Sequence, residues 1–283
     1  MTRTPPISIV IRTFNSARTI DEVLSRLALG AEDEIIVVDS GSCDATLEIA
    51  GKHHARIIGS APPFNYSRTL NEGFLIARNP WVLVISSHCI PVQSGLLERL
   101  REVAAAAGPA LAVAYGLTCL REPARISQEV EFGGMDDWNA GRFRNGGNGL
   151  ALYRKSLWEQ CPFDESLITA EDLVWFLWAL EGGHRAALVH GALCFYRNQG
   201  SLCHMFRKGW FENQIAAKML KARLPPVNFA RNMRMLSLNV GHLGKLLLRR
   251  EIPLRTFIAQ LAHACGAFLE AMCRLLKFSG ETP

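Results

Sequence analysis

The chain has 283 residues, 49% hydrophobic and 20% charged, a balance that excludes intrinsic disorder as a description of the whole protein. Its formal net charge is +5, and the basic excess lies in residues 201–283, which carry 13 Lys and Arg against 4 Asp and Glu. A basic region of this kind favours an anionic partner such as phospholipid headgroups, a polyprenyl diphosphate or an acidic glycan. The sequence has no helix-turn-helix, zinc-finger or RNA-binding signature, so we expect no nucleic-acid partner.

The eight cysteines form no Cys-x-x-Cys pair and lie mostly among apolar residues. This usage predicts buried free thiols in a reducing compartment rather than a disulfide framework. The longest uncharged stretch of the tail, 256–269, is shorter than the roughly 20 residues that a membrane-spanning helix needs. We expect a cytoplasmic protein, with peripheral contact at the inner face of the cytoplasmic membrane as an alternative.

Strands and helices alternate along the first part of the chain. Short β-branched runs predict strands, and apolar residues at helical spacing, such as Ile20, Val23, Leu24 and Leu27, predict helices between them. This alternation indicates a parallel sheet with helices on both faces. The predicted strands are 7–11, 34–38, 55–58 and 81–85, and the predicted helices are 19–29, 46–54 and 67–77.

The pattern continues beyond residue 94 with a long interruption. Residues 121–148 are dense in Gly and Asn and predict a loop. Thr169 followed by Glu171 and Asp172 is typical of a helix start, and the Gly182-Gly183 pair ends that helix. The other predicted elements are a helix over 94–107, strands over 110–118, 149–153 and 186–196, and a mostly helical region from residue 201.

Polar residues follow the predicted strands at their carboxyl ends. Thr13 and Asn15 follow the first strand, Asp39 the second, and His88 the strand over 81–85. In an open α/β sheet, ligands bind at this edge. The sequence therefore predicts one binding site to which separate elements contribute.

Four stretches in this order resemble a known family: "ISIVIRTFNSARTIDEVLSRL", "EIIVVDSGSCDATLEIA", "ISSHCIP" and "TAEDLVWFLWALEGGHRAALV". Together they are similar to family-2 inverting glycosyltransferases, most of all to the rhamnosyltransferase-like branch of bacterial polysaccharide synthesis. The resemblance covers about residues 6–210. It implies the GT-A fold, a Rossmann-like α/β domain with a mostly parallel central sheet. We predict that domain over 1–204 and a basic, mainly helical extension over 205–283.

The resemblance implies a nucleotide-sugar site at the predicted sheet edge. Asp39 would accept a hydrogen bond from the nucleotide base, although an Asp here could instead only cap the following loop. Arg144 could grip the diphosphate or lie in a solvated loop. The residues implied in donor binding are Thr13, Asn15, Asp39, Arg68, Asn71, Ser87, His88 and Arg144.

The Glu171-Asp172 pair matches the base motif of the family. Asp172 would take the proton of the acceptor hydroxyl as that oxygen attacks the anomeric carbon. Glu171 would raise the pKa of Asp172 by repulsion, whereas the helix N-terminus would lower it. The alternative is that both are first-turn residues that only favour the helix dipole.

The stretch Ser86-Ser87-His88-Cys89 departs from the family, whose members place a metal-binding Asp here. His88 could be a metal ligand, better suited to Mn²⁺ than to Mg²⁺, or could contact the diphosphate directly. The third reading is a site without activity. His204 is a second candidate ligand in the sequence "CFYRNQGSLCH".

These residues predict an enzyme that moves a hexosyl or deoxyhexosyl group from a nucleotide-diphosphate sugar to a glycan or polyprenyl-linked glycan acceptor. The alternative is a catalytically inactive sugar-nucleotide-binding or scaffold protein of a polysaccharide assembly complex. The apolar and basic residues of 205–283 alternate at helical spacing. That tail could lie on an anionic membrane, pack as a helical subdomain or form a homodimer interface.

Overall fold

A computed structural model describes residues 4–119, 125–143, 145–167, 169–197, 209–210 and 258. The chain divides into two compact units, the first made of Met1–Leu167 and Glu171–Arg197, the second of Ile168–Ala170 and Asn198–Pro283. Nearly all of the predicted extension over 205–283, and the predicted boundary at 204, lie outside the described residues. Within the described ranges, no helix is both long and apolar enough to span a bilayer.

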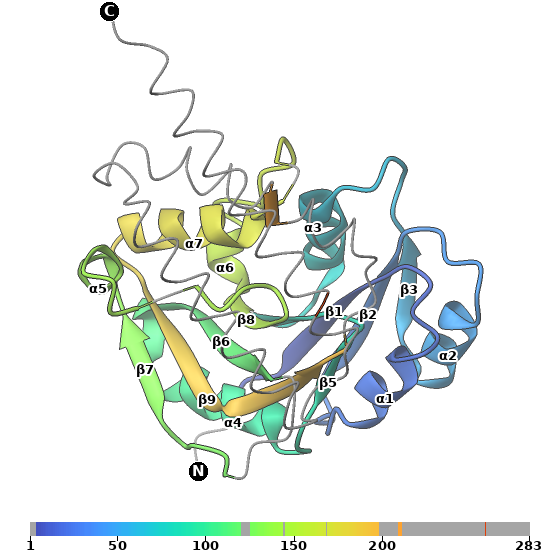
Figure 1. Ribbon diagram of the computed structural model, residues 1–283, viewed down its shortest axis with the longest axis horizontal. Coiled ribbons are helices and arrows are strands. Elements are labelled where there is room, and N and C mark those ends of the chain that lie inside the picture. Colours follow the sequence, from blue (N-terminus) through green and yellow to red (C-terminus); the bar gives the residue numbers. More distant parts are fainter. Residues whose placement is uncertain are drawn as a thin grey trace, which may run out of the picture. The chain divides into compact units, whose positions relative to one another are not determined.

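The first unit is built around one mixed sheet (Figure 1). Its first four strands are parallel, as predicted, in the order β3-β2-β1-β4, whereas β8 runs antiparallel to both β4 and β6. Beyond β8 the order is β6-β9-β5, and β7 pairs with β9. The strands are β1 (Ile7–Thr13), β2 (Glu34–Asp39), β3 (Arg56–Gly59), β4 (Trp81–Ile85), β5 (Cys89–Pro91), β6 (Leu111–Cys119), β7 (Val130–Gly133), β8 (Leu150–Arg154) and β9 (Arg185–Tyr196).

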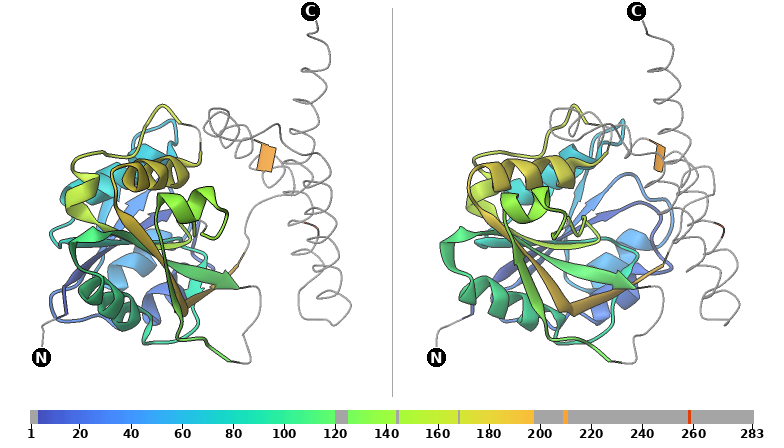
Figure 2. Two further views of the ribbon diagram at one scale, coloured as in Figure 1. Left: turned by 90° about the vertical axis from the view of Figure 1, so that its left-hand side faces the viewer. Right: turned by 60° about the vertical axis from the view of Figure 1, so that its left-hand side comes forward.

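Helices cover both faces of this sheet, because its central strands are apolar on both sides (Figures 1 and 2). In β1, Ile9 and Ile11 belong to the core beneath α1, α2 and α4, whereas Val10 belongs to the core beneath α3, α6 and α7. This alternation follows from the two-residue period of a strand. The helices are α1 (Ile20–Ser25), α2 (Thr46–Lys52), α3 (Tyr66–Ile76), α4 (Leu96–Ala106), α5 (Met135–Asn139), α6 (Lys155–Trp158) and α7 (Glu171–Glu181), and a short 3₁₀ turn spans Gly108–Ala110.

The structure corrects two of the predicted elements. The first helix ends at Ser25 rather than near residue 29, although Leu27 is still buried, so its apolar character reflects packing and not continued helix. The predicted loop over 121–148 contains β7 and α5. β7 depends on pairing with β9 across a long sequence separation, which a local pattern does not reveal.

Candidate functional site

The carboxyl ends of β1 and β2 meet at Thr13 and Asp39, which are register partners. The Thr13 hydroxyl donates to Asp39 Oδ1 at 2.9 Å, and the Ser42 hydroxyl donates to the same oxygen at 2.5 Å. The backbone amides of Gly41 and Ser42 donate to Asp39 Oδ2 at 2.9 and 2.8 Å. Asp39 therefore caps its own loop with both oxygens, so a nucleotide base could bind this carboxylate only beside these donors or in place of one.

Asn15 joins the loop after β1 to the loop after β2. Its backbone amide donates to the Ser42 hydroxyl at 2.8 Å, and its side-chain oxygen accepts from the amide of Cys43 at 2.9 Å. Asn15 has a φ of 48°, a conformation that Asn adopts more readily than most residues. Between Thr13 and Asn15 lies Phe14, a residue that is 60% exposed. An exposed aromatic side chain at this edge offers a face for stacking that polar strand-end residues alone do not predict.

Ser87 lies where β4 ends, next to the loop that follows β1. Its hydroxyl is 2.8 Å from the hydroxyl of Ser16, and its carbonyl accepts from the Thr19 hydroxyl at 2.7 Å. His88 follows with its carbonyl accepting from the amide of Arg197 at 2.9 Å. The His88 ring lies edge-on to Tyr196, with centroids 5.0 Å apart. Thr13, Asn15 and Asp39, three of the four residues predicted to converge here, are thus linked through the loops after β1 and β2, and the Ser16–Ser87 contact joins the end of β4 to them. The shared binding site with His88 stays a prediction.

Arg68 and Asn71 of α3 direct their side chains into hydrogen bonds with other residues of the first unit. The Arg68 guanidinium donates to the carbonyls of Ala61 and Pro63. The Asn71 amide group donates to the Phe163 carbonyl and to Glu165, both at 2.9 Å. Its oxygen accepts from the Trp158 indole and from the amide of Phe163, at 3.0 and 3.1 Å. These four bonds use the full capacity of an Asn amide, so we no longer include Asn71 among the donor-binding residues.

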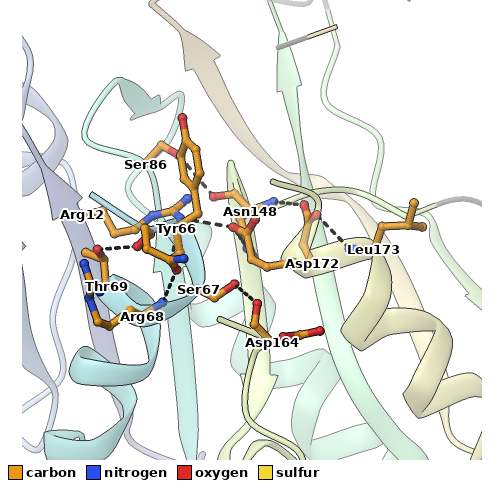
Figure 3. Close-up of polar contacts among 12 residues, drawn as sticks. Arg12, Tyr66, Ser67, Arg68, Thr69, Ser86, Asn148, Asp164, Asp172 and Leu173 are labelled. Atoms are coloured by element: carbon orange, nitrogen blue, oxygen red, sulfur yellow. Dashed lines mark hydrogen bonds and ion pairs between the residues drawn. The ribbon is translucent and has the colours of Figure 1, made fainter. Parts of the chain in front are cut away.

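The Glu171-Asp172 pair begins α7, and its two carboxylates have different partners (Figure 3). Glu171 is 5% exposed, forms an ion pair with Arg12 at 3.2 Å and accepts from the Asn148 side chain at 3.1 Å. Asp172 accepts from the backbone amides of Asn148 and Leu173 at 3.0 and 2.8 Å. We therefore revise the prediction that Glu171 shares the catalytic role, because its carboxylate is buried in an ion pair.

Arg12 and Asn148 connect this helix start to the sheet, and the sequence analysis named neither. Arg12, one residue before Thr13, also donates to the carbonyl of Tyr66 at 3.2 Å, and its guanidinium lies over the Tyr66 ring at 4.9 Å. Asn148 lies two residues before β8 and accepts from the Tyr153 hydroxyl at 2.6 Å. The Arg12–Glu171 ion pair thus places the start of α7 beside the carboxyl end of β1.

His88 lies outside the cluster of metal-ligating side chains found among the described residues. The one group of three or more metal-ligating side chains that the described ranges contain is Glu129, Glu131 and His190, on and beside β7 and β9. His88 is not a member of that group, so among the described residues fewer than three protein ligands gather around it at the end of β4. Arg144 and His204, predicted to contact the diphosphate and a metal, lie outside the described residues.

An open α/β sheet with polar loops at the carboxyl ends of its strands is typical of proteins that bind ligands such as nucleotides at that edge. Residues 8–159, more than half of the chain, match the family described as glycosyl transferase family 2. The chain belongs to this family, as predicted, and has its GT-A fold.

The search of solved structures finds the same fold. A mannosyltransferase from Pyrobaculum calidifontis, in complex with GDP-Man and Mn²⁺, is 16% identical with a TM-score of 0.62, over 100% of this chain and 77% of that one. Glucosyl-3-phosphoglycerate synthase from Mycobacterium tuberculosis, in complex with Mn²⁺, UDP and glucosyl-3-phosphoglycerate, is 19% identical with a TM-score of 0.56, over 77% and 79%. The search of curated proteins finds no match.

Proposed function

We propose that this protein is an inverting glycosyltransferase that moves a hexosyl or deoxyhexosyl group from a nucleotide-diphosphate sugar to a glycan or lipid-linked glycan acceptor. Family membership supports the transferase activity, and two neighbours of the same fold have nucleotides or nucleotide sugars bound. The observation that carries the proposal is the Arg12–Glu171 ion pair, because it places Asp172 at the sheet edge that also carries the loops after β1 and β2. The resemblance to rhamnosyltransferases favours a role in bacterial surface polysaccharide synthesis.

The donor nucleotide would lie over the loops after β1, β2 and β4. Exposed Phe14 offers a face for stacking, and Thr13 and Asn15 offer polar contacts on either side of it. Asp39 would act mainly by holding the loop through the amides of Gly41 and Ser42. This arrangement accepts a planar base through shape and stacking.

Asp172 would act as the general base. Its carboxylate takes the proton of the acceptor hydroxyl while that oxygen forms a bond to the anomeric carbon of the donor sugar. The bond from the anomeric carbon to the diphosphate oxygen breaks on the opposite face, and the nucleoside diphosphate leaves with the electron pair. The anomeric configuration is therefore inverted, with no covalent enzyme intermediate.

The diphosphate would lie near Ser87 and His88, where a hydroxyl and an imidazole can donate hydrogen bonds to phosphate oxygens. Mn²⁺ is bound in both neighbours described above. His88 alone, with no carboxylate in place of the usual Asp, is a weak basis for such a site. In the proposed transfer, Ser87 and His88 would contact the diphosphate and Asp172 would take the proton.

Composition is what supports our proposal for the acceptor and for the location in the cell. The net charge of residues 201–283 favours contact with a polyprenyl diphosphate or with anionic lipid at the cytoplasmic face of the membrane. The apolar residues of 205–283, which recur at helical spacing, would serve equally well as a homodimer interface.

The test compares Asp172→Asn with the wild-type protein, using a panel of nucleotide-diphosphate sugars. We expect turnover to fall about 10²- to 10⁴-fold, the usual contribution of a general base, while nucleotide affinity stays the same. Unchanged turnover would remove Asp172 from the mechanism. Nucleotide binding without any turnover in the wild-type protein would favour the alternative, an inactive binding or scaffold protein.

A further inference from the structure

Asn148 uses every one of its polar groups inside the first unit. Its backbone amide donates to Asp172, and its backbone carbonyl accepts from the Ser86 hydroxyl at 3.2 Å. Its side-chain amide donates to Glu171, and its side-chain oxygen accepts from the Tyr153 hydroxyl. The residue is 7% exposed. One Asn therefore touches both members of the acidic pair, Ser86 after β4 and Tyr153 of β8. Figure 3 shows its contacts with Ser86 and Asp172.

The glycines around Asn148 let this loop come close to the core. A Cβ atom on Gly146 would lie 2.4 Å from the Cβ of Tyr115, so a larger residue would push the loop outward. Gly147 has a φ of 76°, and a Cβ there would lie 3.4 Å from the carboxylate of Asp172. The stretch Gly146–Asn148 is thus packed closely against Tyr115 and the start of α7.

The Tyr153 hydroxyl has one role beside this loop, as a hydrogen-bond donor to the side-chain oxygen of Asn148. Burial raises the pKa of its hydroxyl well above the usual range, and the negative charge of nearby groups, including Asp172, raises it further. The phenol is therefore neutral at every pH at which the protein would work. It always donates to Asn148, which fixes the side-chain oxygen of Asn148 on Tyr153 and leaves its amide hydrogens for Glu171.

We propose that Asn148 is a positioning residue for the base Asp172, acting through its backbone amide and through Glu171, which Arg12 holds from the other side. Arg12 and Asn148 both bond to the Glu171 carboxylate, and the backbone amide of Asn148 donates to the neighbouring carboxylate of Asp172. The loop before β8 thus contributes one of the hydrogen bonds that direct the Asp172 carboxylate, beside the bond from the Leu173 amide. This inference rests on the proposed function, because it names what orients the base of that reaction.

Two readouts test the proposal in the full-length chain. Asn148→Ala removes the bonds to Glu171 and Tyr153 and loosens the amide that faces Asp172. A hydrogen bond to the charged form lowers a carboxyl pKa, so its loss should raise the pKa of Asp172. We expect kcat to fall about 10- to 100-fold, as for a misplaced catalytic group, with little change in the donor KM. The acid limb of the kcat profile should move to higher pH by about half a unit or more.

The second readout needs no activity. The carboxyl ¹³C resonance of Asp172, assigned by its loss in Asp172→Asn, should titrate at higher pH in Asn148→Ala than in the wild-type protein. Tyr153→Phe keeps the ring and removes only the hydroxyl, and should shift the resonance in the same direction by less. This variant decides the question if Asn148→Ala does not fold.

A matched control is Ser8→Ala, which removes a fully buried hydroxyl bonded to Glu34 at the opposite end of β1. An equal shift in this control would overturn the proposal, since any loss of stability would then give the same result. An unchanged Asp172 titration in both Asn148→Ala and Tyr153→Phe would also overturn it. If the wild-type protein transfers no sugar, the proposed function fails, and the ¹³C titration still decides whether Asn148 positions Asp172.

Discussion

Arg12 and Glu171 form an ion pair whose side chains are only 16% and 6% exposed, so removing one partner leaves a charge in a poorly solvated place. Arg12→Met keeps the apolar stem and removes the guanidinium. Breaking a buried pair in this way typically costs about 3–5 kcal/mol of unfolding free energy. We expect the lower end, about 3 kcal/mol, because Glu171 keeps its bond from Asn148. Urea unfolding followed by tryptophan fluorescence measures the change.

A double-mutant cycle isolates the pair itself. Glu171→Gln should cost less, about 1–2 kcal/mol, because Arg12 keeps the Tyr66 carbonyl and ring. The double variant should cost less than the sum of the single variants by about 1–2 kcal/mol, the usual coupling between residues in contact. Additive costs, to within about 0.5 kcal/mol, would show that the two charges do not interact, and would refute the argument that this ion pair holds α7 beside β1.

Three further outcomes follow from other parts of the first unit. Burial raises the pKa of the Glu34 carboxyl, but hydrogen bonds from Ser8 and Arg78 outweigh burial, so the pKa is lowered. The stability that Glu34 contributes is therefore present above its unfolded-state pKa and is lost as pH falls through its folded-state pKa. In Ser8→Ala the free energy of unfolding should therefore fall less steeply with decreasing pH in the acid range. An unchanged slope would contradict the claim that the Ser8 hydrogen bond lowers the pKa of Glu34. Asp39→Asn should cost about 2 kcal/mol in denaturant unfolding, because two of its four accepted bonds would face an N–H group. Thermal shift with nucleoside diphosphates in Mn²⁺, Mg²⁺ and EDTA tests His88: a metal-dependent shift that His88→Ala erases would establish a metal site, and an equal shift in EDTA would establish direct contact.

The sheet and most helices could be predicted because their signals are local. The β-branched runs of β1, β2 and β4 and the helical spacing in α3 and α4 are complete within a few residues. The polar residues at strand ends were predictable for the same reason, since a parallel sheet brings such ends together. The three-residue β5 and the edge strand β7 were not predictable, because both exist through pairing with β9.

The start of α7 shows what the local sequence does not predict. In the sequence, Glu171 and Asp172 are two acidic residues in a first turn, and the helix dipole favours both alike. Adjacent helical residues point about 100° apart, so the two carboxylates meet different sets of partners, and those partners lie elsewhere in the chain. Arg12 is 159 positions from Glu171, and Asn148 is 24 from Asp172. These distant contacts give one carboxylate a buried anchoring role and hold the other by a backbone amide, which is why the division of roles between them emerges only from the fold.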